Sequence, residues 1–345
     1  MAKQSPAKNK RPTMYDVAKL AGVSQPTVSR VLNENDTAVT ISEDTRTRVM
    51  AAIEELGYRP NVLARSLRTQ RTQTIALMIA DLSNGFYHPI ARAVQDVARV
   101  HDYEVLISNS DHVYENEKHF CQVVSRRPVD GAIIVPIHLT EQDIRQYFGK
   151  SNTPVSMLGS HLHLENVDVV YVDDERATYE AVRWMITERG YHDFGFIGVS
   201  DDLPPGPRRF NGFRRALDEF GLTFDPRFYV EGDFTMEGGA AAARTLMRSG
   251  TLPRALFACN DLMAIGAILT FQEAGVQIPD QVAVMGFDDI PEARIIRPML
   301  TTIAQDPRDI GLKLANALFE RLESPTPIPT RVFESERRLV VRDSA

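Results

Sequence analysis

The chain has 345 residues, of which 43% are hydrophobic and 25% charged, and these values are typical of a globular protein with two or three domains. Residues 1–72 hold 12 basic and 7 acidic side chains, whereas the rest holds 27 basic and 39 acidic ones, so only the N-terminal part suits a polyanion. We expect residues 1–12 to be a disordered basic tail rather than a signal peptide, and no segment approaches the ~20 apolar residues of a membrane span, so we expect a cytoplasmic protein.

The first predicted helix begins after Thr13. Thr13 and Asp16 have the spacing of a capping box, in which each side chain accepts a hydrogen bond from the other residue's backbone. Gly22 is well placed to end this helix in a left-handed conformation. We expect a tight turn to follow.

A second predicted helix begins after Ser24, which is expected to be its N-cap. This places Gln25 and Pro26 in the first helical turn, where the N–H that proline lacks would have no intrahelical partner. The apolar face of this helix consists of Val28, Val31 and Leu32. Ser42 is the expected cap of a third helix that Gly57 ends, and the three helices predict a helix-turn-helix head over residues 13–60.

The segments YDVAKLAGVSQPTVSRVLN, ISEDTRTRVMAAIEELGYRPN and VLARSLR carry a resemblance. They are similar, almost residue by residue, to the DNA-binding head of the lactose/galactose repressor (LacI/GalR) family. The resemblance implies that Gln25, Pro26 and Arg30 face base edges in the major groove. It also implies contacts that hold phosphates or stabilise the head, made by Tyr15, Ser24, Thr27, Ser29, Asn33 and Ser42.

Residues 61–73 are expected to form a hinge helix and linker. About eight residues are too few for a stable isolated helix. The resemblance implies a hinge that folds on operator DNA beside its dimer mate, with minor-groove contacts from Asn61, Ala64, Leu67 and Arg68. Leu67 matches the leucine that is wedged into the central base step. A solvated linker would explain residues 69–73, but not the apolar residues at 62, 63 and 67.

From residue 74 onwards, strand-like and helix-like segments alternate, which predicts an α/β fold with parallel sheets. We expect an N-lobe of about 74–171 plus a return crossing near 301–306, and a C-lobe of about 173–303 plus a C-terminal strand. The resemblance implies the same for residues 74–345: a two-lobed, periplasmic-binding-protein-like core around a cleft. Cys121 and Cys259 lie far apart in apolar segments, which predicts buried thiols.

Ligands of such sheets bind beyond the carboxyl ends of the strands. A polyol needs carboxylate, amide and guanidinium groups together with an aromatic face. The candidate effector contacts, several of which match family effector positions, are Phe86, Tyr87, Arg209, Phe234, Asn260, Asp288 and Gln305. Asp261 and Asp289, which stand beside two of them, are expected to be helix caps.

Two departures from the family pattern bear on the ligand. Leu203 and Pro205 stand where purine-responsive relatives carry arginine and threonine, which disfavours a purine. Gly159 stands where some sugar-responsive relatives carry aspartate, so the identity of the sugar stays open. His161 and His163 are interpreted as loop histidines, because a metal site needs more ligands than lie nearby, and no cofactor is expected.

These features predict a sequence-specific DNA-binding transcription regulator, a repressor of carbohydrate-metabolism genes that is switched by a sugar-like effector. We expect a homodimer on pseudo-palindromic double-stranded operator DNA, because by resemblance a chain without a leucine-heptad tail is dimeric. A solute-binding protein would explain the core but not the head, and an enzyme is disfavoured because no P-loop, nucleophile elbow or zinc motif occurs. The effector could release or promote DNA binding.

Overall fold

The structure is a computed structural model that describes residues 12–32, 41–59, 71–126, 129–149 and 153–345. It divides the chain into a head, Met1–Thr72, and a core, Gln73–Ala345, which are described separately. Some predicted DNA contacts lie outside the described residues: Asn33, Asn61, Ala64, Leu67 and Arg68.

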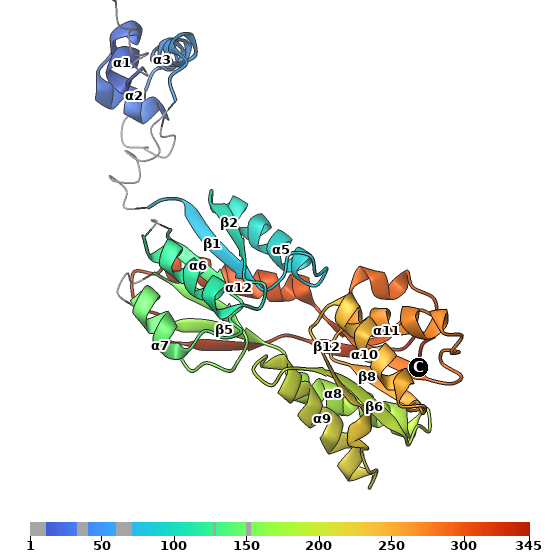
Figure 1. Cartoon of the computed structure of the whole chain (residues 1–345). Helices are drawn as coiled ribbons and strands as arrows, with labels where there is room; N and C mark the ends of the chain where they lie inside the picture. The colour runs from blue at the N-terminus through green and yellow to red at the C-terminus, as the bar shows by residue number, and fades with distance from the viewer. Residues whose placement is uncertain (1–11, 33–40, 60–70, 127–128, 150–152) are drawn as a thin grey trace, which may run out of the picture. The chain divides into compact units, whose positions relative to one another are not determined.

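The head contains the helices α1 (Met14–Ala21), α2 (Gln25–Leu32) and α3 (Glu43–Leu56), shown in Figure 1. The capping box between Thr13 and Asp16 is present, and Gly22 ends α1 with a φ of 66°. The backbone N–H of Thr27 donates to Ser24 Oγ at 3.3 Å, so Pro26 lies at the second position of α2. The predicted caps and helices of the head are therefore confirmed.

A small apolar core joins the three helices of the head. Its buried residues are Val17, Ala18, Ala21, Val28, Val31, Val49, Ala52 and Tyr58. Arg48 of α3 also donates from Nη1 to the carbonyl oxygen of Ala21 at 3.0 Å, which satisfies an acceptor at the end of α1. The packing fixes α2 with its Val28 face inward and its polar face outward.

The N-lobe of the core is a parallel sheet in the strand order β11-β5-β4-β3-β1-β2. Its strands are β1 (Thr74–Ile79), β2 (Glu104–Asn109), β3 (Gly131–Ile134), β4 (Val155–Leu158), β5 (Val167–Tyr171) and β11 (Arg331–Glu334). The accompanying helices are α5 (Tyr87–Val100), α6 (Tyr114–Arg126), α7 (Glu141–Ile144), which a π-helical turn at Arg145–Gly149 extends, and α12 (Pro307–Glu323).

The C-lobe sheet has the order β12-β10-β9-β8-β6-β7, and it is parallel except for the antiparallel edge strand β12. Its strands are β6 (Phe194–Val199), β7 (Tyr229–Gly232), β8 (Ala255–Ala258), β9 (Ala283–Asp288), β10 (Thr301–Gln305) and β12 (Arg337–Val340). Its helices are α8 (Asp174–Thr187), α9 (Pro205–Glu219), α10 (Met236–Arg248) and α11 (Asp261–Glu273), with 3-10 turns at Pro226–Phe228 and Pro291–Arg294. Figure 1 shows the α8–α9 and α10–α11 pairs on opposite faces of this sheet.

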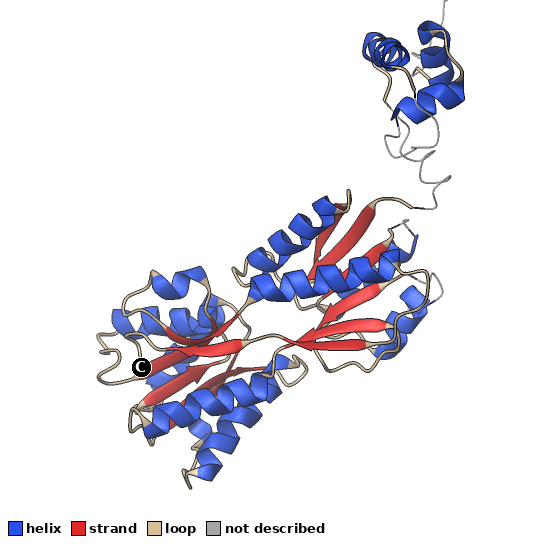
Figure 2. Cartoon of the chain, turned by 180° about the vertical axis from the view of Figure 1, so that it is seen from behind, coloured by secondary structure: helices blue, strands red, loops and turns tan. Residues whose placement is uncertain are grey.

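The chain passes between the lobes after β5, after β10 and after β11, and Figure 2 shows these connections side by side. Each lobe is therefore built from segments that lie far apart in the sequence. The crossing after β5 leads directly into α8, and the crossing after β10 leads into α12. The carboxyl ends of the parallel strands of both sheets face the space between the lobes.

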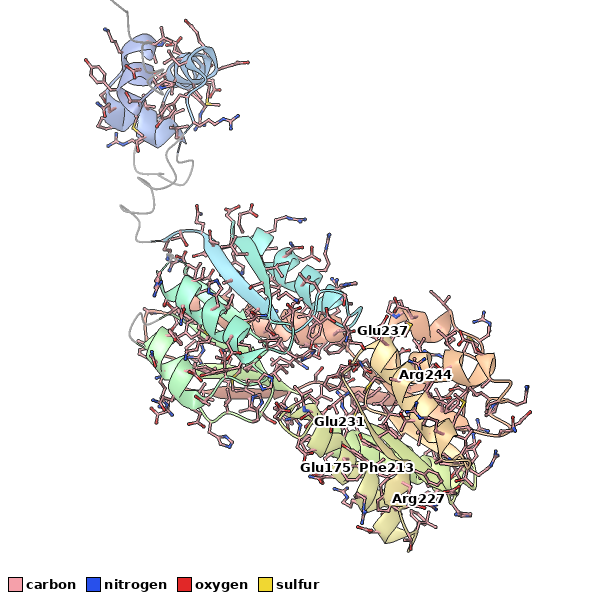
Figure 3. The ribbon with its side chains drawn as sticks, in the orientation of Figure 1. Glu175, Phe213, Arg227, Glu231, Glu237 and Arg244 are labelled. Atoms are coloured by element: carbon pink, nitrogen blue, oxygen red, sulfur yellow. The ribbon has the colours of Figure 1, made fainter. Side chains whose placement is uncertain are left out.

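An aromatic cluster holds α9 against the C-lobe sheet. The ring of Phe213 lies 4.9 Å from that of Phe196 and 5.3 Å from that of Phe224, centroid to centroid. Gly212 lets α9 approach α8 closely, because a Cβ there would collide with the carbonyl oxygen of Glu175; Figure 3 labels Glu175 and Phe213. This packing fixes the start of α9, which bears Arg208 and Arg209.

The fold agrees with the predicted α/β class, with a helix-turn-helix head and a two-lobed core. The structure differs from the predicted parallel sheets in one respect, since the C-lobe edge strand β12 is antiparallel. Both cysteines are buried and free of disulfides, as predicted, and burial raises the pKa of each thiol to about 12. Within the described parts of the chain, no helix combines the length and apolar character needed to cross a bilayer.

Candidate functional site

The outer face of α2 is the candidate recognition surface of the head. Gln25, Pro26 and Arg30 are exposed, and Ser29 is half-buried beside them. Pro26 and Arg30 are four residues apart, as are Gln25 and Ser29, so each pair lies on adjacent turns of one helix face. Arg30 supplies a planar set of donors, whereas Pro26 offers only an apolar surface.

Four of the predicted phosphate contacts of the head fall into two groups. The side chain of Tyr15 is on the surface of α1 and 60% exposed. Ser24, Thr27 and Ser42 already take part in helix capping: Ser24 Oγ lies 2.8 Å from Thr27 Oγ1, and Ser42 Oγ accepts from the backbone N–H of Thr45 at 3.3 Å. These hydroxyls are therefore held in fixed positions at the starts of α2 and α3.

A cavity of about 810 Å³, which includes its opening to solvent, lies between the two lobes of the core. It lies at the carboxyl ends of the strands, as expected for doubly wound sheets. The structure brings all of the candidate effector contacts to its wall: Phe86, Tyr87, Arg209, Phe234, Asn260, Asp288 and Gln305.

A row of charged groups runs along the C-lobe wall of the cavity. Arg208 and Arg209 clasp opposite oxygens of the Asp174 carboxylate, at 2.7 Å and 3.0 Å. Arg209 Nη2 lies 4.0 Å from Asp288 Oδ1, and Gln305 Nε2 donates to the same oxygen at 2.7 Å. Arg209 also donates to the carbonyl oxygen of Cys259 and covers the Phe287 ring, so its guanidinium is held from several sides.

Asp288 is almost fully buried, and this burial determines its protonation. Burial raises the pKa of the Asp288 carboxyl to about 8, although Arg209 and Gln305 act in the opposite direction. The group is therefore largely protonated at neutral pH, when it can donate as well as accept. Burial also raises the pKa of Tyr87, and Asp288 adds to this shift, so the phenol stays neutral.

Asn260 has a structural role in the wall of the cavity. Its Oδ1 accepts from the backbone N–H of Met263 at 2.9 Å, which makes it the N-cap of α11, and its Nδ2 donates to the carbonyl oxygen of Phe234 at 2.9 Å. Phe234 has a φ of 65° and Asp288 a φ of 123°, values that cost free energy outside glycine. Strained backbone thus occurs at two of the candidate contacts.

The predicted capping roles of Asp261 and Asp289 are wrong. Asp261 is the first residue of α11 rather than its cap, and it is completely buried, where it accepts from Thr302 Oγ1 at 2.5 Å and from the backbone N–H of Ile290 at 3.0 Å. Asp289 instead pairs with Arg294 at 2.8 Å and with Arg342. Both carboxyls brace the loop that follows β9.

The N-lobe wall combines an aromatic pair with a loop that a buried carboxylate holds in place. The rings of Phe86 and Tyr87 pack edge to face with centroids 5.1 Å apart. Glu117 of α6 is completely buried and accepts the backbone N–H groups of three consecutive loop residues at 2.8–3.0 Å, namely Ile137, His138 and Leu139. Burial raises the pKa of Glu117, and the three N–H donors oppose that shift.

Two side-chain contacts connect the lobes. The ring of His112, from the N-lobe, stacks on Phe234 of the C-lobe with centroids 5.7 Å apart. His138 Nδ1 lies 3.8 Å from the carboxylate of Asp202. The two lobes are thus in side-chain contact, and the His112–Phe234 pair lies in the wall of the cavity.

The predicted effector contacts leave out several residues of the cavity wall: Asn84, His112, His161, Tyr171, Asp174 and Arg208. His161 does lie in a loop, as predicted, but this loop follows β4 and borders the cavity; its position just beyond a strand end was the signal that could have identified it. His163 is exposed. Among the residues that the structure describes, no group of three potential metal ligands occurs.

Known proteins resemble the chain over nearly its full length. Residues 13–61 match the model of bacterial regulatory proteins of the lacI family, and residues 166–345 match the periplasmic binding protein-like domain. Catabolite control protein A of Priestia megaterium is 33% identical over 96% of this chain and 98% of its own.

Two solved structures extend this comparison to three dimensions. The lac repressor dimer bound to operator and the anti-inducer ONPF has a TM-score of 0.83 at 26% identity, over 97% of this chain and 99% of that one. The complex of the transcriptional regulator CelR with cellobiose has a TM-score of 0.71 at 29% identity, over 97% of this chain and all of that one. The chain belongs to the lacI family of bacterial regulatory proteins.

Proposed function

We propose that this chain is a sequence-specific DNA-binding transcription regulator, which represses carbohydrate-metabolism genes under the allosteric control of a small sugar-like effector. The observation that carries the proposal is the combination, in one chain, of an exposed polar face on α2 and a cleft lined by carboxyl, amide and aromatic groups. The similarity to regulators in complex with operator and with cellobiose supports both halves. The relatives are regulators rather than enzymes, and we propose no catalytic activity.

On the DNA side, Arg30 pairs with guanine through two hydrogen bonds, and Gln25 pairs with adenine or a phosphate. Pro26 contributes an apolar contact only. Phosphate contacts position the head without reading sequence, and we assign them to Tyr15, Ser24, Thr27, Ser29, Asn33 and Ser42. Attraction between the phosphates and the lysine and arginine side chains of the basic N-terminal part of the chain supplies much of the affinity.

The hinge completes the DNA-bound state. We assign the minor-groove contacts to Asn61, Ala64, Leu67 and Arg68, with Leu67 as the wedge that kinks the central base step. Two copies of the chain, as a cytoplasmic homodimer, read the two halves of a pseudo-palindromic operator. Replacing Leu67 with alanine would then reduce DNA bending while leaving the folded core unchanged.

On the effector side, the hydroxyls of a sugar bind Asp288 and Gln305, while Phe86, Tyr87 and Phe234 cover its C–H face. A ligand in the cleft contacts both lobes and adds to the bridges that His112 and His138 make between them. It thereby favours one arrangement of the lobes over another. If DNA binding favours only one of these arrangements, the two sites are coupled.

The test is a selection of duplexes from a random pool by the full-length protein. We expect enrichment of one pseudo-palindrome, bound about 10³-fold or more tightly than random duplex at physiological salt. A protein without any sequence preference under these conditions would exclude the regulator. Asp288→Ala is the matched test of the effector site, since it should abolish sugar binding in calorimetry while operator selection proceeds unchanged.

A further inference from the structure

The charged row along the C-lobe wall has two chemically different ends. Asp288, with Gln305 beside it, stands at one end, and Arg208 stands at the other, beyond Asp174 and Arg209. The first end offers a carboxyl and an amide, as hydroxyl groups require. The second end offers a guanidinium group. Its charge strengthens a hydrogen bond to an anion more than one to a neutral hydroxyl.

One terminal nitrogen of Arg208 has no hydrogen-bond acceptor among the residues that the structure describes. Its Nε and Nη2 donate to Asp174 Oδ2 at 3.0 Å and 2.7 Å, whereas its Nη1 makes no hydrogen bond within the described residues. The side chain borders the cavity and is 29% exposed. Asp174 therefore anchors Arg208 in place and leaves part of its guanidinium to a ligand.

His161 borders the cavity near Arg208 and lacks partners. Both of its ring nitrogens are buried and make no hydrogen bond to any residue that the structure describes. Burial and, second to it, the charge of Arg208 lower the pKa of His161 to about 4, so the ring is neutral. Buried polar groups are normally paired, so an imidazole with two unpaired nitrogens indicates a ligand that completes it.

Gly159 makes room for this ring. Its φ is +119°, which disfavours any other residue, and a Cβ there would lie 3.1 Å from His161 Nδ1. The aspartate expected at this place in some sugar-responsive relatives would thus be strained here. His161 occupies the space beside Gly159, and the wall carries a neutral imidazole where a carboxylate would repel an acid.

At the start of α9, backbone N–H groups are not available to bind a ligand, so side chains have to bind it. Pro204, Pro205 and Pro207 have no N–H, and the N–H of Gly206 already donates to the carbonyl oxygen of Leu203 at 2.9 Å. The positive end of the helix dipole nevertheless faces the cavity, because Pro204 and Pro205 line it. An anion at this place gains the favourable potential but has to be held by Arg208.

The charges that line the cavity leave an excess of positive charge. Two guanidinium groups, Arg208 and Arg209, face the carboxylate of Asp174, and Asp288 is largely protonated at neutral pH because burial raises its pKa to about 8. A neutral sugar would leave this excess uncompensated inside a partly closed cavity. An acidic ligand would neutralise it.

We propose that Arg208 and His161 form a subsite for an acidic group of the effector, a carboxylate or a phosphate, so that the effector is a sugar acid or a sugar phosphate. Its hydroxyls bind Asp288 and Gln305 at the opposite end of the row. The proposal rests on the sugar effector of the proposed function and identifies its chemical class.

The test is calorimetry on the full-length protein with matched sets of ligands: glucose, glucuronate and glucose 6-phosphate, and the corresponding galactose series. We expect at least one acid to bind about tenfold or more tightly than its neutral parent, since a charge-assisted hydrogen bond is roughly twice as strong as a neutral one. The uronate and phosphate arms distinguish a carboxylate subsite from a phosphate subsite.

Variants separate the subsite from general damage to the cleft. Arg208→Gln should weaken binding of the acid by roughly ten- to a hundredfold more than binding of the neutral parent, because only the acid uses the lost charge. His161→Ala should weaken the acid less, by about three- to tenfold. Arg214→Gln is the control, because Arg214 is on the same helix but is exposed and lies 3.9 Å from Asp218.

The proposal is overturned if neutral sugars bind as tightly as their acids, or if Arg208→Gln weakens both classes equally. Either result leaves the sugar effector of the proposed function in place. If no member of either series binds while the same sample selects an operator, both the subsite and the sugar effector are contradicted, and the DNA-binding function stands.

Discussion

The head and the core present their candidate binding groups in opposite ways. On α2, Gln25, Pro26 and Arg30 are exposed above a small core to which they do not contribute. In the cleft, Arg209 and Asn260 are bonded to protein neighbours before any ligand arrives. The recognition surface can therefore change at little cost to the fold, whereas the cleft residues also hold the C-lobe together.

The largest expected effect tests whether the cleft residues stabilise the core. Asp174→Ala removes the buried carboxylate that Arg208 and Arg209 share, and leaves two guanidinium groups without it. We expect the free energy of unfolding of the core to fall by about 3–5 kcal/mol. Trp184 is the one tryptophan of the chain and lies in α8, so urea denaturation followed by its fluorescence reports on this region.

The control for Asp174→Ala is Glu175→Ala on the same helix. Glu175 is partly exposed and pairs with Arg215 at 3.2 Å, so its removal should change the free energy of unfolding by no more than about 0.5 kcal/mol. Equal effects of the two substitutions would show that Asp174 does not hold the cleft.

Arg30→Ala tests whether the exposed face of α2 reads DNA without stabilising the head. We expect a loss of about 1–3 kcal/mol in operator affinity and relaxed specificity at one base pair, because a bidentate contact to guanine is lost. Unfolding of the head should change by less than about 0.5 kcal/mol, since the side chain is exposed. Fluorescence anisotropy on operator and random duplex measures the affinity and the specificity, and thermal unfolding measures the stability.

Tyr15→Phe serves as the comparison for Arg30→Ala. It should weaken binding to operator and random duplex alike, because a phosphate contact carries no sequence information. If Arg30→Ala also weakens the two duplexes equally, Arg30 does not read bases.

Asp288 makes the stability of the core depend on pH. Burial raises its pKa in the folded state from 3.8 to about 8, so the folded state keeps a proton that the unfolded state has lost between these values. Its contribution is fully present below about pH 4 and is lost as the pH rises towards 8, by at most about 1.4 kcal/mol per pH unit. Asp288→Asn should remove the part of this slope that Asp288 contributes, which urea denaturation from pH 6 to 9 measures.

A slope of the same sign should remain in Asp288→Asn, since burial also raises the pKa of Asp261, to about 7. An identical pH profile for wild type and variant would mean that Asp288 is ionised in the folded protein.

The smallest effect is expected for Pro26→Ala. The N–H that alanine restores lies in the first turn of α2, where it has no intrahelical acceptor, so we expect the stability of the head to change by less than about 0.5 kcal/mol. Thermal unfolding followed by circular dichroism measures it. A change of more than about 1 kcal/mol would place Pro26 in the core of the head rather than on its surface.

The sequence predicts best what depends on near neighbours. The caps Thr13, Ser24 and Ser42 act on N–H groups three residues away, so a short segment contains all the information required. The strand-end rule likewise predicts that Phe86, Tyr87, Asn260 and Asp288 lie together, as they do in the cavity wall, because parallel strands present their carboxyl ends at the same edge. The capping rule and the strand-end rule can therefore be applied without knowing how the helices pack or in which order the strands pair.

What the sequence could not predict depends on distant partners. Asn260 rather than Asp261 caps α11, and the reason is that Thr302 and Ile290, which lie far along the chain, bind the Asp261 carboxylate. The buried carboxylate of Asp168 similarly depends on two distant arginines, Arg321 and Arg331. Such long-range contacts decide whether a polar side chain caps a helix, holds a loop in place or stays available to bind a ligand.

The most direct test of the account is the affinity of the full-length protein for its selected operator, with and without a saturating concentration of the sugar derivative that binds most tightly in calorimetry. We predict a change of about 5- to 150-fold, corresponding to a coupling free energy of about 1–3 kcal/mol, and its loss in Asp288→Ala. An operator affinity that is the same with the cleft empty and occupied would contradict the account.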